Sequence, residues 1–486
     1  MTRSIAAILT AAAALTAPAN AQAPELTPEP NHTPNTAAAP DAAERFNIEK
    51  PFSHAAAARI FTPDRRIDAT RINPQHFHLD FHAPTGAYFA VASWSDGWGV
   101  YRSTNNGLTW TNTYFFNAVV PTFDVDLVAT DDWVYIAYAV DTPTSDDWAR
   151  LRRVDANTGL VDNAFSFQIV FEEDGNPVKE VELAADADDQ GLGQGLLYTA
   201  LYDDGSIRYA FDQVSDGTTF SEITTGITNA NNQLNFHYNA NRTSPRFAFL
   251  SFVNNAGDIQ VYSRGGGPDW DLRKTIFSVQ SATQHSLTAA AGLVMVSFAD
   301  TAEEARYEVS YDAGDTWFFG SNNASMLVNA TPSNASVTAR LGYGTARATT
   351  VELGADDEII LDIRQTQAPG AWRSSLTPED NDVFTLLGLD IDIEALPIPD
   401  PTLQYRYGIL WYSDTDATLR FDRVDGCPGD TDGDRLVGLD DLLNILSAFG
   451  ETDAESPYDG DLDADNIIGL DDLLLVLSEF GNTCPV

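Results

Sequence analysis

The chain has 486 residues, which is enough for two or three domains, and its 43% hydrophobic and 11% aromatic content is typical of a globular protein rather than a disordered one. Seventy-one Asp and Glu residues against 27 Lys and Arg give a formal net charge of -44. A field of this sign repels phosphate backbones and anionic membranes, which argues against nucleic-acid binding, and it attracts divalent cations.

The first residues have the layout of a secretory signal peptide. Arg3 precedes an apolar run from Ile5 to Leu15, and Ala19-Asn20-Ala21 provides small residues for cleavage. The run is too short for a permanent membrane helix, and no later stretch reaches roughly 18 uninterrupted apolar residues. We therefore expect residues 1–21 to be a signal peptide and the mature protein to be secreted, without a membrane span.

The composition and apolar pattern of the chain change twice before its C-terminal region. Residues 22–44 are rich in Pro, Ala, Thr and Glu and offer little to bury, which predicts a disordered spacer. From 45 to 425, short apolar runs such as Tyr88-Phe89-Ala90-Val91-Ala92 alternate with clusters of Asp, Asn, Gly and Thr. Helical periodicity is almost absent, so this region is predicted to be an all-β domain.

An octapeptide repeat refines this prediction. Residues 310–317 read Ser-Tyr-Asp-Ala-Gly-Asp-Thr-Trp, residues 103–110 match with Asn in place of Asp, and 263–270 and 217–220 are degenerate copies. The repeat ends recur at spacings near fifty residues, with one doubled gap, at Trp110, Phe220, Trp270, Trp317, Trp372 and Phe421. A period of this size in β-rich sequence predicts a β-propeller of six or seven blades.

The octapeptide resembles the Asp-box of sialidases and related BNR-repeat proteins. In that family, the polar turn residue and Gly close a hairpin while the Trp packs between sheets, at the periphery of the blades. The resemblance therefore implies the fold and not a reaction. Arg71-Ile72-Asn73-Pro74 comes close to the Arg-Ile-Pro signature of sialidases, but the inserted Asn73 breaks it, and we assign no catalytic residue.

The segment 76–82, His-Phe-His-Leu-Asp-Phe-His, is a further candidate site. In a strand, His76, His78, Asp80 and His82 share one face, while the apolar residues share the other. Two histidines at i and i+2 can chelate a metal ion, although spacing along a strand keeps all four groups from meeting one ion. The alternative is a polar face that lines the propeller channel or meets solvent.

Four aromatic residues are candidates for stacking against sugar rings: Trp94, Trp98, Trp411 and Tyr412. Binding modules use exposed aromatic rings in this way. Packing between blades is the alternative use of each of them.

The C-terminal region contains a duplicated twelve-residue pattern, which begins at Asp430 and again at Asp461. Carboxylates at loop positions one, three, five and twelve, with a backbone carbonyl at position seven, are the ligand set of an EF-hand. The predicted ligands of two calcium ions are Asp430, Asp432, Asp434, Leu436, Asp441, Asp461, Asp463, Asp465, Ile467 and Asp472. Position six, commonly Gly, is Arg435 in the first loop and Asn466 in the second, so tighter binding is expected in the second.

An apolar helical stripe follows each loop and ends before Gly450 or Gly481. Paired loop-helix units with Asp at position twelve resemble a dockerin over residues 427–486, which implies a small α-helical calcium-binding module and a cohesin-like protein partner. Cys427 and Cys484, the two cysteines of the chain, bracket this module, and in an oxidising compartment they are expected to form a disulfide.

Together these features predict a secreted, dockerin-bearing propeller that acts as a binding or scaffolding component in extracellular polysaccharide use. The partner of the dockerin-like module is expected to hold it outside the cell or at the cell surface, and a carbohydrate is a possible ligand of the propeller. One alternative is a sialidase-like glycoside hydrolase or a lyase, and another is a surface adhesion protein. An acid-nucleophile pair near the propeller axis favours the enzyme, whereas an aromatic platform without such a pair favours binding.

Overall fold

The computed structural model describes residues 65–450 and 468–481, with gaps of which the longest internal ones are 186–194, 322–330, 376–390 and 396–405. The predicted signal peptide (1–21) and spacer (22–44) lie outside the described residues. Within the described part, the chain forms seven four-stranded antiparallel sheets, numbered here in chain order by their first strands, and two helices.

The first four sheets are each made of consecutive strands. Sheet 1 contains β2 (His76–His82), β3 (Ala87–Trp94), β4 (Gly97–Ser103) and β5 (Thr111–Asn117). Sheet 2 contains β6 (Thr122–Ala129), β7 (Trp133–Val140), β8 (Asp146–Asp155) and β9 (Gln168–Asp174). Sheet 3 contains β10 (Val178–Ala185), β11 (Leu196–Tyr202), β12 (Ile207–Asp212) and β13 (Ser221–Thr224). Sheet 4 contains β14 (Ala230–Tyr238), β15 (Arg246–Asn254), β16 (Ile259–Gly265) and β17 (Trp270–Ile276).

The last three sheets include the one that joins the two ends of the β-region. Sheet 5 contains β18 (His285–Ala290), β19 (Leu293–Ala299), β20 (Ala305–Ser310) and β21 (Phe318–Ser321). Sheet 6 contains β22 (Thr331–Arg340), β23 (Gly344–Leu353), β24 (Asp356–Arg364) and β25 (Arg373–Ser375). Sheet 7 contains β26 (Ile391–Ala395), β27 (Arg406–Ser413), β28 (Thr418–Asp425) and the early strand β1 (Arg65–Arg66).

In sheet 1, the burial of a strand depends on its place in the sheet. In sheet 1, every residue of β3 is buried, and its sequence is accordingly almost continuously apolar. In the first strand, β2, half-buried polar residues alternate with buried apolar ones up to Phe81, and His82 is buried. The fourth strand, β5, is the most exposed of the sheet. The apolar content of a strand therefore reports how far it is covered on its two faces.

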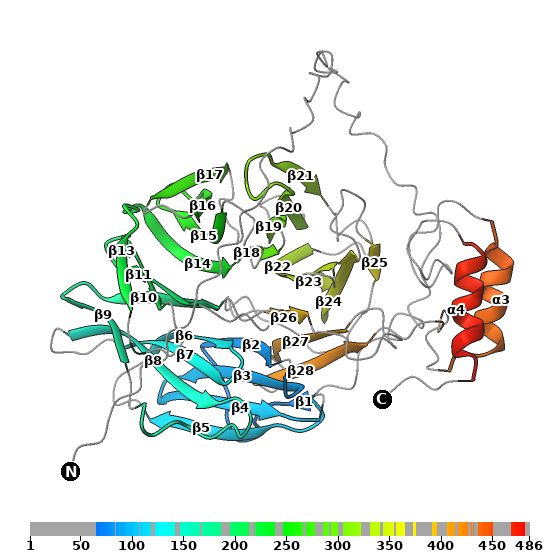
Figure 1. Ribbon diagram of the computed structural model, residues 1–486, viewed down its shortest axis with the longest axis horizontal. Helices are drawn as coiled ribbons and strands as arrows, with labels where there is room; N and C mark the ends of the chain where they lie inside the picture. The colour runs from blue at the N-terminus through cyan, green and yellow to red at the C-terminus, as the bar shows by residue number, and fades with distance from the viewer. Residues whose placement is uncertain are drawn as a thin grey trace, which may run out of the picture. The chain divides into compact units, whose positions relative to one another are not determined.

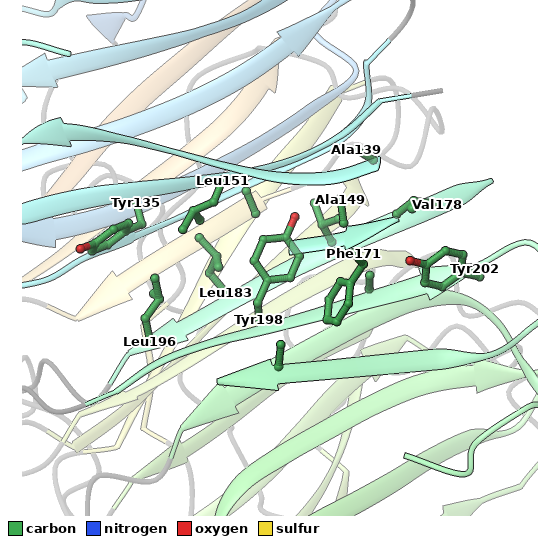
Figure 2. Packing of buried hydrophobic residues seen from close by; sticks show 14 of the residues in the cluster. Tyr135, Ala139, Ala149, Leu151, Phe171, Val178, Leu183, Leu196, Tyr198 and Tyr202 are labelled. Carbon is green, nitrogen blue, oxygen red and sulfur yellow. The ribbon is translucent and has the colours of Figure 1, made fainter. Parts of the chain in front are cut away.

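Sheets 2 and 3 pack against each other through apolar side chains. Between sheets 2 and 3, Tyr135 and Leu151 meet Leu183 and Tyr198 in one buried cluster (Figure 2). The Tyr198 hydroxyl donates a hydrogen bond to the Arg150 carbonyl oxygen at 3.0 Å, which satisfies a polar atom inside this apolar layer. Large aromatic rings thus fill the space between these two sheets.

The first strands arrange the sheets in a ring (Figure 1). Each first strand contacts the first strand of the next sheet, in the order β2, β6, β10, β14, β18, β22, β26 and back to β2. Four-stranded antiparallel sheets arranged in this way form a β-propeller. The all-β prediction for this region is confirmed.

Strand β1 completes sheet 7. Arg65 and Arg66 pair with Phe421 and Arg420 of β28, and the N–H of buried Ile67 donates to the Leu419 carbonyl at 3.0 Å. Phe421 therefore lies in the third strand of its sheet and is not equivalent to the repeat-end aromatics. The repeat-end aromatics of the earlier sheets instead precede or begin the fourth strand of their sheet: Trp110, Phe220, Trp270 and Trp317. The repeat-based assignment of Phe421 was wrong because an N-terminal strand supplies the fourth strand of sheet 7.

The two best Asp-box copies form matching turns. In 310–317, the Asp312 carboxylate accepts hydrogen bonds from the backbone and hydroxyl of Thr316 at 2.8 and 2.6 Å, while Ser310 Oγ accepts the Gly314 N–H at 2.8 Å. Partial burial raises the pKa of Asp312, but these hydrogen bonds outweigh it and hold the pKa at about 2. In 103–110, Asn105 and Ser103 make the corresponding bonds to Thr109 and Gly107. The Asn in the Asp place thus preserves the turn.

The turn at 103–110 also packs tightly against sheet 7. Gly107 has a positive φ of 80°, and a Cβ at this position would overlap the ring of Phe421. The rings of Trp110 and Phe421 lie 5.1 Å apart, and that of Tyr88 lies 4.8 Å from Phe421. The glycine is therefore required both by its backbone conformation and by the close approach of the neighbouring sheet.

We expect Gly107→Ala to destabilise the protein by about 3 kcal/mol or more, because it adds an overlap with Phe421 to backbone strain. The matched control is Gly257→Ala, which has a φ of 85° and no heavy atom within 4 Å of its added Cβ. This variant should cost about 1 kcal/mol in free energy of unfolding. Urea unfolding of both variants measures the difference. Equal losses in free energy of unfolding would contradict the proposed tight packing of Gly107 against Phe421.

The two helices form a duplicated unit of their own. Helix α3 (Leu439–Ala448) and helix α4 (Leu470–Glu479) contact each other around the buried residues Val437, Ile445, Ile468 and Val476. The N–H of Gly450, after α3, donates to the Ile468 carbonyl, and that of Gly481, after α4, donates to the Val437 carbonyl, both at 2.8 Å. Both glycines have a positive φ, as the sequence predicts for helix ends. Neither helix has the length and apolarity needed to cross a membrane.

Candidate functional site

The candidate site lies on the polar face of the first strands. Phe77, Leu79 and Phe81 of β2 are buried in the core that sheet 1 shares with sheet 7. Because side chains alternate along a strand, His76 and His78 lie on the opposite face, toward sheet 2. Their side chains are 39% and 31% exposed.

Each of these two histidines is paired with a carboxylate of β6. His76 Nδ1 lies 3.2 Å from Asp124 Oδ1, and His78 Nδ1 lies 3.4 Å from Asp126 Oδ1. Both aspartates are buried, with 5% of their surface exposed. Two half-exposed imidazoles are thus backed by two buried carboxylates.

The same carboxylates join sheet 2 to sheet 3. Asp124 Oδ2 accepts a hydrogen bond from the Val181 N–H at 2.8 Å, and Asp126 Oδ2 accepts one from the Leu183 N–H at 2.6 Å. Their other oxygens accept the backbone N–H of the following residue, at 2.9 Å for Asp124 and 2.7 Å for Asp126. One sheet earlier, Asp80 of β2 accepts the Ala129 N–H of β6. Each of these carboxylates is therefore committed to holding the first strand of the next sheet.

The pattern continues through sheets 4 and 5. Both oxygens of Glu180 in β10 accept backbone N–H groups of β14, from Gln233 and Leu234. Gln233 Oε1 in turn accepts the backbone N–H of His285 in β18 at 3.1 Å, and Asn235 Nδ2 donates to the His285 carbonyl at 3.2 Å. We call this set of side-chain bonds, formed by Asp80, Asp124, Asp126, Glu180, Gln233 and Asn235, the inner belt.

Burial changes the proton affinities of this region. Desolvation raises the pKa of Asp124 and of Asp126 to about 6, against smaller lowering contributions from His78 and backbone N–H groups. Desolvation raises the pKa of Glu180 to about 7, and the nearby charge of Asp124 adds to the rise. Surrounding protein lowers the pKa of His76 to about 4, although part of its side chain stays open, and His78 adds to this effect. At neutral pH the His76 imidazole is therefore uncharged.

A second histidine cluster is connected like a hydrolase triad, but its residues are buried away from any substrate. Ser251 Oγ lies 2.9 Å from His285 Nε2, and His285 Nδ1 lies 3.0 Å from Gln233 Oε1. Both Ser251 and His285 are buried, and burial lowers the pKa of His285 to about 3. A base needs a pKa near the working pH, and a nucleophile needs an open path to substrate. This cluster is therefore part of the packed interior.

The four residues of the predicted metal candidate do not converge. His76 and His78 face separate aspartates, and Asp80 holds Ala129. His82 is buried, with Nδ1 at 2.6 Å from Thr85 Oγ1 and Nε2 at 2.9 Å from the Asp131 carbonyl oxygen. Across the part of the chain that the structure describes, no three His, Cys, Asp or Glu side chains are grouped to hold a metal ion.

The sialidase-like Arg71 is occupied by its own sheet. Its guanidinium lies 3.5 Å from the ring centre of Phe115 and 5.1 Å from that of Trp94, and it donates to Asp96 Oδ1 at 2.8 Å. A guanidinium clamped between aromatic rings and a carboxylate stabilises the sheet. These contacts use the group that a sialidase would direct at a substrate carboxylate.

The four aromatic residues considered for sugar stacking are buried. Trp98 and Trp411 are fully enclosed, and Trp94 and Tyr412 are at most 4% exposed. Trp98, for example, packs against Tyr138 at a ring distance of 5.0 Å. The packing alternative applies to all four.

Two of the ten predicted calcium ligands have described side chains at helix starts. Asp441 and Asp472, the twelfth positions of the two loops, are each 1% exposed and accept the N–H of Gly438 at 2.7 Å and Gly469 at 2.6 Å. The Leu436 side chain is 42% exposed. Cys427 and Cys484 lie outside the described residues. So do the remaining predicted ligands: Asp430, Asp432, Asp434, Asp461, Asp463, Asp465 and Ile467.

The helices expose an apolar surface at equivalent positions. In each helix, one side of the predicted stripe is buried at Ile445 or Val476. Four further apolar residues in or next to each helix are between 49% and 61% exposed: Leu439, Leu443, Leu446 and Phe449, and then Leu470, Leu474, Leu477 and Phe480. We call these eight residues the helix-pair surface.

Sequence reasoning named Asp80 but missed the other carboxylates of the inner belt, Asp124, Asp126 and Glu180. The available signal was the alternation of acidic and apolar residues in Asp124-Val125-Asp126-Leu127 and Glu180-Val181-Glu182-Leu183. Carboxylates at every second position of an otherwise apolar strand indicate one acidic face in a buried setting. Their partners could not be inferred, because these depend on the register between sheets.

The pKa of Glu180, about 7, lies above its ordinary value of 4.5, so the folded state holds this proton more tightly than the unfolded state. Its contribution to stability is present at low pH and is lost as the pH rises through 7. The measured quantity is the free energy of unfolding of the wild type minus that of Glu180→Gln. We expect this difference to fall by about 2 kcal/mol between pH 5.5 and pH 8. Urea titrations at both pH values measure this, and an identical difference at the two would contradict it.

No family model matches this chain, and no curated protein matches it in sequence. Among solved structures, a lectin from Burkholderia pseudomallei is similar with a TM-score of 0.53 at 12% identity, over 73% of this chain and 97% of the lectin. An alpha-L-arabinanase from Penicillium chrysogenum, complexed with arabinobiose, has a TM-score of 0.45 at 11% identity, over 75% of this chain and 98% of the arabinanase. A mutant of the sialidase NanB from Streptococcus pneumoniae has a TM-score of 0.41 at 12% identity, over 75% and 70%. At these identities the similarity concerns the fold.

Proposed function

We propose that this chain is a secreted, seven-bladed β-propeller that binds carbohydrate and is attached to a partner protein through a calcium-loaded, dockerin-like module. The observation that carries binding rather than catalysis is the commitment of the inner-belt carboxylates. Asp124, Asp126 and Glu180 each use both oxygens to accept backbone N–H groups. A catalytic carboxylate must instead present an oxygen to the substrate.

The closed series of contacts from β2 to β26 and back supports seven blades, with β1 as the outermost strand of the last one. A ring that is closed by pairing an N-terminal strand with the C-terminal one resists opening, because both chain ends of the domain lie in one sheet. Carbohydrate binding is supported by the lectin from Burkholderia pseudomallei, which shares this fold.

An enzyme, either a sialidase-like glycoside hydrolase or a lyase, is the second candidate. The observation in its favour is the His76–Asp124 pair, in which a half-exposed imidazole is backed by a buried carboxylate. This arrangement can move a proton in other proteins. The low pKa of His76, about 4, makes it a weak base at neutral pH, which favours binding over catalysis.

Calcium fits the buried carboxylates of the helical module. Asp441 and Asp472 are almost completely enclosed at equivalent positions, and burying a carboxylate is costly unless a cation or hydrogen bonds compensate it. Calcium bound through the predicted loops would supply positive charge beside each carboxylate and bring the loop carboxylates together. A disulfide between Cys427 and Cys484 would join the two ends of the same module.

The helix-pair surface supports docking. Its eight apolar side chains recur at the same positions of α3 and α4. An exposed apolar surface of this kind on a small unit marks a protein interface, and we assign it to a cohesin-like partner. This attachment would hold the secreted propeller outside the cell or at its surface.

Calcium removal should destabilise the helical module. We expect excess chelator to lower the first thermal transition of the full-length mature protein, with recovery on adding calcium. Asp441→Asn should weaken calcium binding about tenfold or more, since it removes one loop carboxylate, while the exposed neighbour Asp440→Asn serves as the matched control. Calorimetric titration measures calcium binding by the two variants. A melting curve that does not change with chelator, or equal calcium binding by the two variants, would contradict the calcium assignment.

The function is tested by incubating the mature protein, in calcium-containing buffer, with sialosides and with a panel of plant and algal polysaccharides. We expect retention on at least one polysaccharide and no release of sugar. Release of sugar would identify an enzyme instead. If the protein is not retained on any polysaccharide and releases no sugar, carbohydrate binding is contradicted. A protein ligand would then be the next hypothesis to test.

A further inference from the structure

The imidazole of His76 has a defined orientation. Its Nδ1 lies 3.2 Å from the buried Asp124 carboxylate, which can only accept a hydrogen bond when ionised. With the proton on Nδ1, which faces Asp124, the other ring nitrogen, Nε2, is a hydrogen-bond acceptor. With 39% of its side chain exposed, His76 can offer this acceptor to a ligand from solvent.

His78 lies two residues further along the same face and has the same carboxylate backing. Its Nδ1 is 3.4 Å from Asp126, and its side chain is 31% exposed. Side chains at i and i+2 of a strand are separated by roughly 6.6 Å, which is close to the length of one sugar ring. The two histidines therefore lie on the same face of β2, next to each other.

The charge around this pair selects among hydroxyl-rich ligands. Asp124 and Asp126 place carboxylates beside the two histidines, and the charge of Asp124 in turn acts on Glu180. Lys179, the cation that acts on Glu180, is engaged by the Asn231 carbonyl at 2.8 Å and lies 3.9 Å from Asp203. A carboxylated or sulfated sugar would therefore meet repulsion at this face, while a neutral sugar would not.

We propose that His76 and His78 form a subsite for a neutral, hydroxyl-rich glycan, in which His76 Nε2 accepts a hydrogen bond from a sugar hydroxyl. The inference rests on the proposed carbohydrate binding and narrows it to uncharged polysaccharides. It assigns the acidic interior of the ring a role in rejecting acidic glycans. The carboxylates themselves remain structural, and their contribution is to fix the orientation of the imidazoles.

The test compares retention of the full mature protein on two neutral polysaccharides, laminarin and arabinoxylan, and on two acidic ones, alginate and polygalacturonate. We expect binding to a neutral polysaccharide and at least about tenfold weaker retention for His76→Ala/His78→Ala. Thr111→Ala, on the exposed fourth strand of the same sheet, is the control and should bind like the wild type. Thermal unfolding of all three proteins shows whether the double variant is folded.

The outcomes separate this inference from the proposed function. Neutral binding that is unchanged in the double variant, or stronger retention on the acidic polysaccharides, would overturn the subsite and leave carbohydrate binding intact. Retention on none of the four and on no other polysaccharide would overturn both. If the double variant does not fold, ¹⁵N imidazole spectra of the wild type replace it. A shift of the His76 Nε2 resonance on adding laminarin oligosaccharides supports the subsite, and unchanged spectra contradict it.

Discussion

The first strand of each sheet is an edge strand, hydrogen-bonded to a neighbour on one side only, and the ring brings these edges together at its centre. Their backbone N–H groups need acceptors, because an unpaired buried N–H is costly. The inner belt supplies these acceptors from the preceding sheet, as Asp124 and Asp126 do for Val181 and Leu183. Side chains thereby make the hydrogen bonds that a further strand would make, and they fix the register between sheets.

This constraint shapes the chemistry at the centre of the ring. Carboxylates that hold backbone groups are unsuited to attack or protonate a substrate, even though desolvation raises their pKa into the range in which acids and bases work. Strongly perturbed pKa values often mark active sites, but buried structural networks perturb them as well. The same carboxylates lie beside two half-exposed histidines, which are the residues of the proposed glycan subsite.

Much of the fold could be predicted from local patterns. The alternation in β2 and the Asp-box at 310–317 depend on neighbouring residues, and both were confirmed. The pairing of β1 with β28 could not be predicted, because a two-residue strand carries no pattern and its partner lies at the far end of the domain. The shared face of His76 and His78 followed from strand alternation, whereas their separate aspartate partners depend on how two sheets meet.

The most direct measurement is the hydrogen exchange of the Val181 and Leu183 amides in the full mature protein. If the inner belt holds the sheets as described, both amides should exchange as slowly as those in the interior of β11, because Asp124 and Asp126 accept their protons. Rapid exchange, typical of an open edge strand, would contradict the account. It would also release these carboxylates from their structural role and make a catalytic centre the better explanation.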